Sequence, residues 1–117
     1  LIHLSSIYGI RAPDFEIYKD THMHTPIEYA AVKGGIINMT KWLAKYYKGN
    51  NVRVNCVSPG GIYNKQAESF IKAYNKHTTN IGMLDPEMIA NICTFLLSEK
   101  ACGINGENIV VDDGWSL

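Results

Sequence analysis

The chain carries no excess of charge of either sign. Its 117 residues include 11 lysines and arginines against 11 aspartates and glutamates. Proteins that bind nucleic acids or anionic membranes present a basic patch or stripe. The balanced charge argues against partners of both kinds, so we expect neither nucleic acid nor a membrane to be bound.

Cysteines are few and show no paired spacing. Cys56, Cys93 and Cys102 form no Cys-x-x-Cys motif, and their odd number argues against a disulfide framework. His22 and His24 stand near no cysteine and no carboxylate pair, so a solvent-facing or pocket-lining position is expected rather than zinc ligation. We predict reduced, mostly buried thiols and no metal site.

Long apolar runs are missing as well. No stretch approaches the ~20 apolar residues of a membrane span. The opening Leu1-Ile2-His3-Leu4 does not resemble a secretory signal, in which a charged segment precedes a long apolar one. These absences predict a cytoplasmic protein, and its 46% hydrophobic content is normal for a globular domain or part of one.

What the chain does contain is an alternation of strand and helix patterns. Short apolar or β-branched runs predict strands, and apolar residues spaced three and four apart predict helices. The predicted strands span residues 1–4, 52–57 and 108–111, and the predicted helices span 28–48, 65–77 and 86–98. Each connection is long enough for a right-handed parallel crossover. The expected architecture is α/β, with about three parallel strands and flanking helices.

Two features of this predicted layout indicate that further backbone packs against it. Gly34-Gly35 lies inside the helix predicted over 28–48, and glycine destabilises a helix by up to ~1 kcal/mol relative to alanine, so another backbone is expected to approach there. A parallel sheet of this size leaves a long edge exposed and looks unfinished at its Leu1 end. Residues 11–27 lack clean periodicity and are expected to be irregular.

Tyr29 and Lys33 are the residues best suited to proton transfer. Four residues apart on a helix, they share one face, and an ammonium beside a phenol favours its ionised form. Alone, such a pair is more often an ordinary surface pair. Here Ser6 follows the first predicted strand and Pro59-Gly60 follows the second, at the strand ends where open α/β sheets bind ligands. The combination therefore predicts a catalytic site.

This combination resembles the short-chain dehydrogenase/reductase family over essentially the whole chain. Ser6 and Gly9 match its Ser-x-x-Gly motif, and Tyr29 and Lys33 match its Tyr-x-x-x-Lys motif. The resemblance implies an oxidoreductase that uses NAD or NADP on a Rossmann-like doubly wound parallel sheet. It further implies that Ser6 orients the reacting oxygen, that Tyr29 is the general acid/base, and that Lys33 promotes ionisation of the tyrosine and bonds the nicotinamide ribose.

The family's Asn-x-Val-x-Pro-Gly motif is matched by Asn55, Val57, Pro59 and Gly60. By the resemblance, the Pro59-Gly60 loop passes the nicotinamide, and the backbone of Ile62 meets its carboxamide. Asn64 stands where the family usually has threonine and keeps a hydrogen-bonding side chain. The implied cofactor contacts are Tyr29, Lys33, Pro59, Gly60, Ile62 and Asn64.

Two departures from the family pattern bear on domain organisation. The interval from Ser6 to Tyr29 is longer than usual, which places residues 11–27 over the substrate pocket as an insertion. The family's glycine-rich phosphate loop is absent. The resemblance therefore implies that residues 1–117 are the C-terminal catalytic portion of one Rossmann-like domain, without its N-terminal dinucleotide-binding half.

Within the family, the insertion and the chain ending at 110–115 look most like flagellin-modification oxidoreductases, which implies a sugar or nucleotide-sugar substrate. The helix that carries Trp42, Tyr46 and Tyr47 commonly builds a dimer interface in the family, so a homo-oligomer is expected. Two alternatives stay open. One is a truncated, non-catalytic chain that acts at most as a binding or interaction module. The other is an epimerase or dehydratase of the extended relatives, against which the Pro-Gly loop argues.

Overall fold

The computed structural model describes the whole chain, residues 1–117. Its strands are β1 (Ile2–Leu4), β2 (Asn55–Pro59) and β3 (Asn108–Val111), and its α-helices are α1 (Ile27–Tyr46), α2 (Glu68–Asn75) and α3 (Pro86–Leu97). Three short 3-10 helices are η1 (Ile7–Gly9), η2 (Phe15–Tyr18) and η3 (Glu99–Ala101). The predicted α/β architecture is confirmed.

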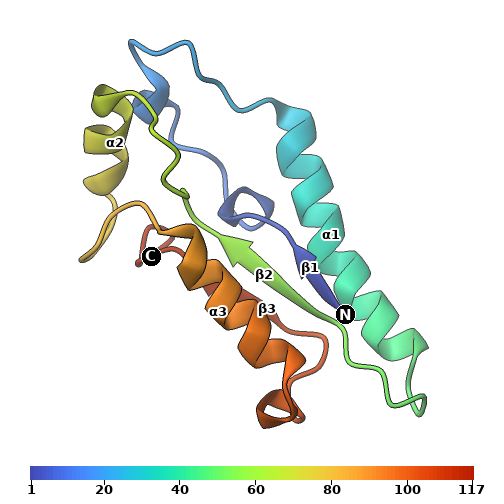
Figure 1. Cartoon of the computed structure of the whole chain (residues 1–117). Helices are drawn as coiled ribbons and strands as arrows, with labels where there is room; N and C mark the ends of the chain where they lie inside the picture. The colour runs from blue at the N-terminus through green and yellow to red at the C-terminus, as the bar shows by residue number, and fades with distance from the viewer.

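The central strand β2 lies between two layers of helix. The sheet order is β1-β2-β3 and both pairs are parallel. All residues of β2 are buried, and their side chains alternate between the two faces of the sheet. Cys56 lies near Thr40 of α1, whereas Val57 packs in one cluster with Leu96 of α3. Figure 1 shows β2 between these two helices, as a doubly wound sheet requires.

The second strand lies further along the chain than predicted. We expected it over residues 52–57, but it runs from Asn55 to Pro59. The residue before it bonds elsewhere, because the Val54 N–H donates to Asn105 Oδ1 at 2.9 Å. Pro59 remains in the ladder because the last residue of a strand can do without an N–H. The sheet therefore reaches directly to the turn after Pro59.

The helices follow their predicted positions closely, except that α2 is shorter than 65–77. Helix α3 begins as expected, with Pro86 in its first turn and the Asp85 carboxylate accepting the Glu87 N–H at 2.8 Å. None of the helices has both the length and the apolar character that a membrane span needs.

The expected backbone approach at Gly34-Gly35 is found at the first glycine only. A Cβ on Gly34 would lie 3.4 Å from the Gly9 carbonyl oxygen, while nothing lies within 4 Å of one on Gly35. At the outer edge of the sheet, β1 pairs with β2 alone, and Leu4 is 52% exposed. The contact between Gly9 and α1 holds the loop that follows β1 against the helix.

The expectation of mostly buried thiols is wrong. Cys56 is buried, but Cys93 is only half-buried and Cys102 is exposed. The reason is position: Cys56 lies on the central strand, Cys93 on a flanking helix, and Cys102 in the surface turn after η3.

Candidate active site

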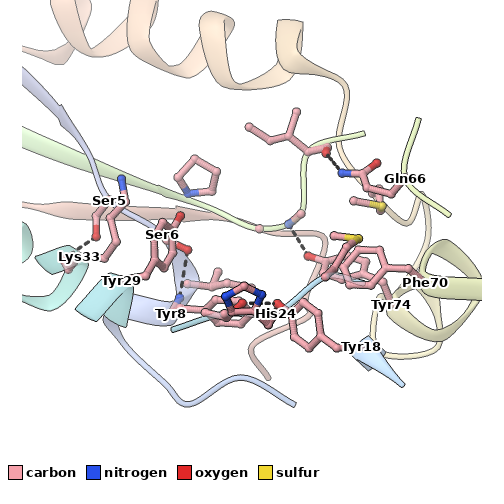
Figure 2. A pocket seen from close by; sticks show the side chains of 18 of the residues that line it. Ser5, Ser6, Tyr8, Tyr18, His24, Tyr29, Lys33, Gln66, Phe70 and Tyr74 are labelled. Atoms are coloured by element: carbon pink, nitrogen blue, oxygen red, sulfur yellow. Dashed lines mark hydrogen bonds between the residues drawn. The ribbon is translucent and has the colours of Figure 1, made fainter. Parts of the chain in front are cut away.

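A cavity of about 490 Å³ opens beyond the carboxyl ends of β1 and β2. Its wall is formed by η1, the insertion 11–27, the start of α1, the turn after β2, and α2 (Figure 2). The predicted site residues that line it are Ser6, Tyr29, Lys33, Pro59, Gly60 and Ile62. Asn64 is not among the lining residues. The structure therefore gathers six of the seven predicted residues at the ligand-binding edge of the sheet.

The turn after β1 is fixed to α1 through Lys33. The Ser5 hydroxyl donates to the Lys33 carbonyl at 2.7 Å, and a Cβ on Gly9 would lie 2.7 Å from the Lys33 carbonyl carbon. Only glycine lets η1 rest on the helix this closely. Ser6 Oγ accepts the Tyr8 N–H at 3.2 Å, which leaves the Ser6 hydroxyl hydrogen free to donate into the cavity.

Tyr29 and Lys33 share one face of α1, as their spacing predicts. Lys33 Nζ lies 5.4 Å from the centroid of the Tyr29 ring and donates to the Leu4 carbonyl at 3.0 Å. An ammonium carries three N–H donors, so two remain for other partners. The Tyr29 side chain is 41% exposed and lines the cavity. Both groups are therefore accessible to a bound ligand.

The turn after β2 is shaped by Tyr74 of α2. The Tyr74 hydroxyl accepts the Gly61 N–H at 2.5 Å. A Cβ on Gly60 would lie 2.7 Å from that hydroxyl, and one on Gly61 would lie 2.7 Å from the tyrosine ring, so neither position tolerates a side chain. Burial raises the pKa of Tyr74 to about 12, although the Gly61 bond opposes the shift. Tyr74 is therefore a neutral, structural group.

Ile62 presents a free backbone donor beside this turn. Its carbonyl accepts Gln66 Nε2 at 2.8 Å, and its neighbours on both sides bond to Leu84. The Ile62 N–H itself forms no hydrogen bond within the chain. Gln66 also accepts the Asn64 N–H at 2.8 Å. Gln66 belongs to no motif, so its part in fixing this loop could not be found from the sequence.

The remainder of the lining includes aromatic side chains that no motif predicts. Tyr8 and Phe70 contribute, and the Tyr18 ring lies 5.4 Å from that of Phe70, which links the insertion to α2. Burial raises the pKa of Tyr8, with a contribution from its bond to Tyr18. His24 is exposed and lines the cavity, which fits the solvent-facing or pocket-lining position expected for it. No three histidine, cysteine or acidic side chains gather closely enough to hold a metal ion.

The chain is similar to known proteins over its whole length. A family model described as enoyl-(acyl carrier protein) reductase matches residues 18–116. The post-translational flagellin modification protein A of Campylobacter coli is 44% identical over 117 residues, which is all of this chain and 46% of that protein. A short chain dehydrogenase from Leptospira borgpetersenii, solved with bound NAD+, has a TM-score of 0.92 and 36% identity, over 99% of this chain and 44% of that one.

The chain belongs to the short-chain dehydrogenase/reductase family. A second dehydrogenase of similar structure, a 4-hydroxyisoleucine dehydrogenase complexed with NADH, has a TM-score of 0.84 and 25% identity, over 98% of this chain and 46% of that one. The chain thus spans about half the length of the relatives it matches. The resemblance stated from the motifs, including the likeness to flagellin-modification oxidoreductases, is confirmed.

Proposed function

We propose that this chain, joined to a dinucleotide-binding half, forms an NAD(P)-dependent oxidoreductase. Its substrate is a sugar or nucleotide sugar, and the reaction interconverts a hydroxyl and a carbonyl group. The observation that carries the proposal is the convergence of Ser6, Tyr29 and Lys33 on one cavity, beside the free N–H of Ile62. The similarity to a flagellin modification protein supports a place in the glycan modification of flagellin.

Ser6 and Tyr29 handle the reacting oxygen in this proposal. In the direction of oxidation, the free Ser6 hydroxyl hydrogen holds the substrate oxygen, and the Tyr29 phenolate takes the proton from it. Lys33, next to the Tyr29 ring, stabilises that phenolate. The nicotinamide, when bound, would supply the hydride acceptor that oxidation of the substrate carbon requires. In the direction of reduction, Tyr29 returns the proton to the oxygen.

The chain offers donors that fit the nicotinamide end of such a cofactor. The two unused N–H groups of Lys33 suit the hydroxyls of a ribose, and the Ile62 N–H suits a carboxamide oxygen. Pro59, Gly60 and Gly61 line the cavity next to these donors, so the turn borders the position proposed for the nicotinamide. Asn64, exposed and outside the cavity lining, remains a predicted contact only.

We also propose that the complete enzyme is a homo-oligomer paired through α1. Trp42 and Tyr46 stack at 4.9 Å on the outer face of this helix and are 60% and 64% exposed. Exposed aromatic clusters of this kind are typical of interaction surfaces. Sedimentation analysis of the complete enzyme is expected to give a dimer or larger assembly, and a monomer would contradict the proposal.

The oxidoreductase function is tested with the complete enzyme by following reduction of NAD and NADP in the presence of nucleotide sugars. We expect turnover with one cofactor and at least one sugar. Lys33→Met is expected to lower both cofactor affinity and rate roughly ten- to a hundredfold, as for a lost charge-assisted hydrogen bond. Lys41→Met, on the exposed side of the same helix, is the control and should change neither. A complete protein that binds neither cofactor would favour the non-catalytic alternative.

A further inference from the structure

Three hydroxyl groups meet in the cavity wall, each from a different segment. Thr25 Oγ1 donates to the Tyr18 hydroxyl at 2.7 Å, and the Tyr8 and Tyr18 hydroxyls lie 2.9 Å apart. Tyr8 belongs to η1, Tyr18 to η2, and Thr25 to the segment just before α1. All three line the same cavity as Tyr29. We call these side chains the hydroxyl triad.

The hydrogen atoms of the hydroxyl triad cannot all be used within it. Three hydroxyls carry three hydrogens, and the triad contains two hydrogen bonds. Because the Thr25 hydrogen is donated to Tyr18, the unused hydrogen belongs to Tyr8 or to Tyr18. In either arrangement the triad keeps one donor for a partner in the cavity.

The hydroxyl triad is held in place by its rings and by the backbone. The Tyr8 ring meets Trp115 edge-on at 5.9 Å, and the Tyr18 ring meets Phe70 at 5.4 Å. The Tyr8 N–H is bonded to Ser6 Oγ, so the triad is also tied to the residue that is proposed to hold the reacting oxygen. Because burial raises the pKa of Tyr8, its hydroxyl keeps its proton. Such a preorganised donor loses little entropy when a ligand binds.

The charge and polarity of the other lining residues indicate which class of ligand the cavity can bind. It contains no aspartate and no glutamate, and its only side chains able to carry a positive charge are Lys33 and His24. Hydroxyl-bearing side chains and aromatic rings share the remainder with aliphatic side chains such as Leu4, Ile7 and Met83. Such a wall suits an uncharged, hydroxylated molecule, whose oxygens accept hydrogen bonds and whose carbon skeleton packs against the rings.

We propose that the hydroxyl triad selects substrates with a second oxygen, away from the reacting carbon, that accepts its free hydrogen bond. The inference rests on the proposed oxidoreductase function and adds the residues that recognise a second oxygen of its polyhydroxylated substrate. The triad positions the substrate and takes no part in proton or hydride transfer, which stays with Tyr29 and the cofactor.

The test compares two ring alcohols as probes on the complete enzyme with NAD and NADP. Cyclohexanol has one oxygen, and myo-inositol has further oxygens around the same ring. Removing the Tyr8 hydroxyl alone would free the hydrogen of Tyr18, so the informative variant is the double replacement Tyr8→Phe with Tyr18→Phe. Tyr63→Phe is the matched control, because its side chain is half exposed and does not line the cavity.

We expect the wild-type enzyme to prefer myo-inositol. The double variant should lower kcat/KM for myo-inositol roughly three- to tenfold, mainly through KM, as for one lost neutral hydrogen bond. It should leave cyclohexanol oxidation unchanged, which also shows that the variant folds. Equal losses on both alcohols, no loss on either, or a wild-type preference for cyclohexanol would overturn the inference.

An enzyme that binds NADH but turns over neither the alcohols nor any nucleotide sugar would count against the proposed function rather than the hydroxyl triad. The triad is then judged by calorimetric titration of the enzyme–NADH complex with myo-inositol. Binding that weakens in the double variant and not in Tyr63→Phe supports the inference. Failure of the wild-type complex to bind myo-inositol overturns it.

Discussion

Replacing Gly9 with alanine tests how the turn after β1 positions the proposed catalytic residues. The new Cβ would lie 2.7 Å from the Lys33 carbonyl carbon, 2.8 Å from the Lys33 oxygen and 2.9 Å from Ser5 Oγ. Ordinary van der Waals contact begins at 3.4 Å, so η1 and α1 must separate by at least about 0.7 Å. None of these neighbours is the flexible end of a long side chain, so the strain cannot be relieved locally.

Two consequences are expected from this separation. Overpacking of this kind costs about 1–3 kcal/mol of folding free energy. Because η1 carries Ser6 at its cap and α1 carries Tyr29, the two groups also move apart, and a displacement near 1 Å can cost about 10²-fold in rate. We therefore expect Gly9→Ala to lower kcat/KM of the complete enzyme roughly ten- to a hundredfold.

The assay is urea unfolding combined with steady-state kinetics, with Gly35→Ala as the matched control. Nothing lies within 4 Å of a Cβ on Gly35, so alanine there should be neutral or should stabilise α1 by about 0.5–1 kcal/mol. Equal stability and activity of the Gly9→Ala and Gly35→Ala variants would refute the packing role given to Gly9.

Two further predictions concern the turns that frame the site. Tyr74→Phe leaves the Gly61 N–H without its partner and is expected to cost about 1–3 kcal/mol in urea unfolding at neutral pH. Because burial raises the pKa of Tyr74 to about 12, the folded state keeps the phenol neutral while the unfolded chain ionises above pH ~10. The stability that Tyr74 contributes should therefore decline between pH ~10 and about 12, a decline that is absent in Tyr74→Phe. Desolvation raises the pKa of Asp113, but the N–H groups of residues 80–82 outweigh it and hold that pKa below its usual value. The contribution of Asp113 to stability is complete above pH ~4 and is lost as pH falls through the lowered pKa. Circular dichroism during acid titration should show this step in the wild type and lose it in Asp113→Ala, and identical acid profiles would contradict it.

The fold could be predicted where local pattern and tertiary packing agree. Helices α1 and α3 show regular apolar spacing, and the Asp85-Pro86 pair predicts the N-cap of α3. The predicted bounds of β2 were wrong because the β-branched alternation of the sequence includes Val54. The Val54 N–H bonds to Asn105, in a loop distant in sequence, and not to a neighbouring strand. Register depends on such long-range bonds, which no local pattern records.

The site could be predicted where residues have fixed chemical roles at fixed spacing. Ser6, Tyr29 and Lys33 carry recognisable groups, and the structure places them around one cavity. The hydroxyl triad and Gln66 could not be predicted from the sequence. Their contacts form only when the insertion packs against α2 and Gln66 bonds the turn after β2. The Ser-x-x-Gly motif does not show why its glycine is needed. In the structure, Gly9 allows η1 to pack against α1 and takes no part in the chemistry.

The central claim is that Tyr29 exchanges the proton that accompanies hydride transfer. It is tested most directly by measuring hydride transfer in the complete enzyme with Tyr29→Phe, together with NADH affinity. The account predicts that the rate falls about 10²- to 10⁴-fold, as expected when a general acid/base is removed, while the variant still binds NADH. Undiminished hydride transfer in Tyr29→Phe would contradict the account.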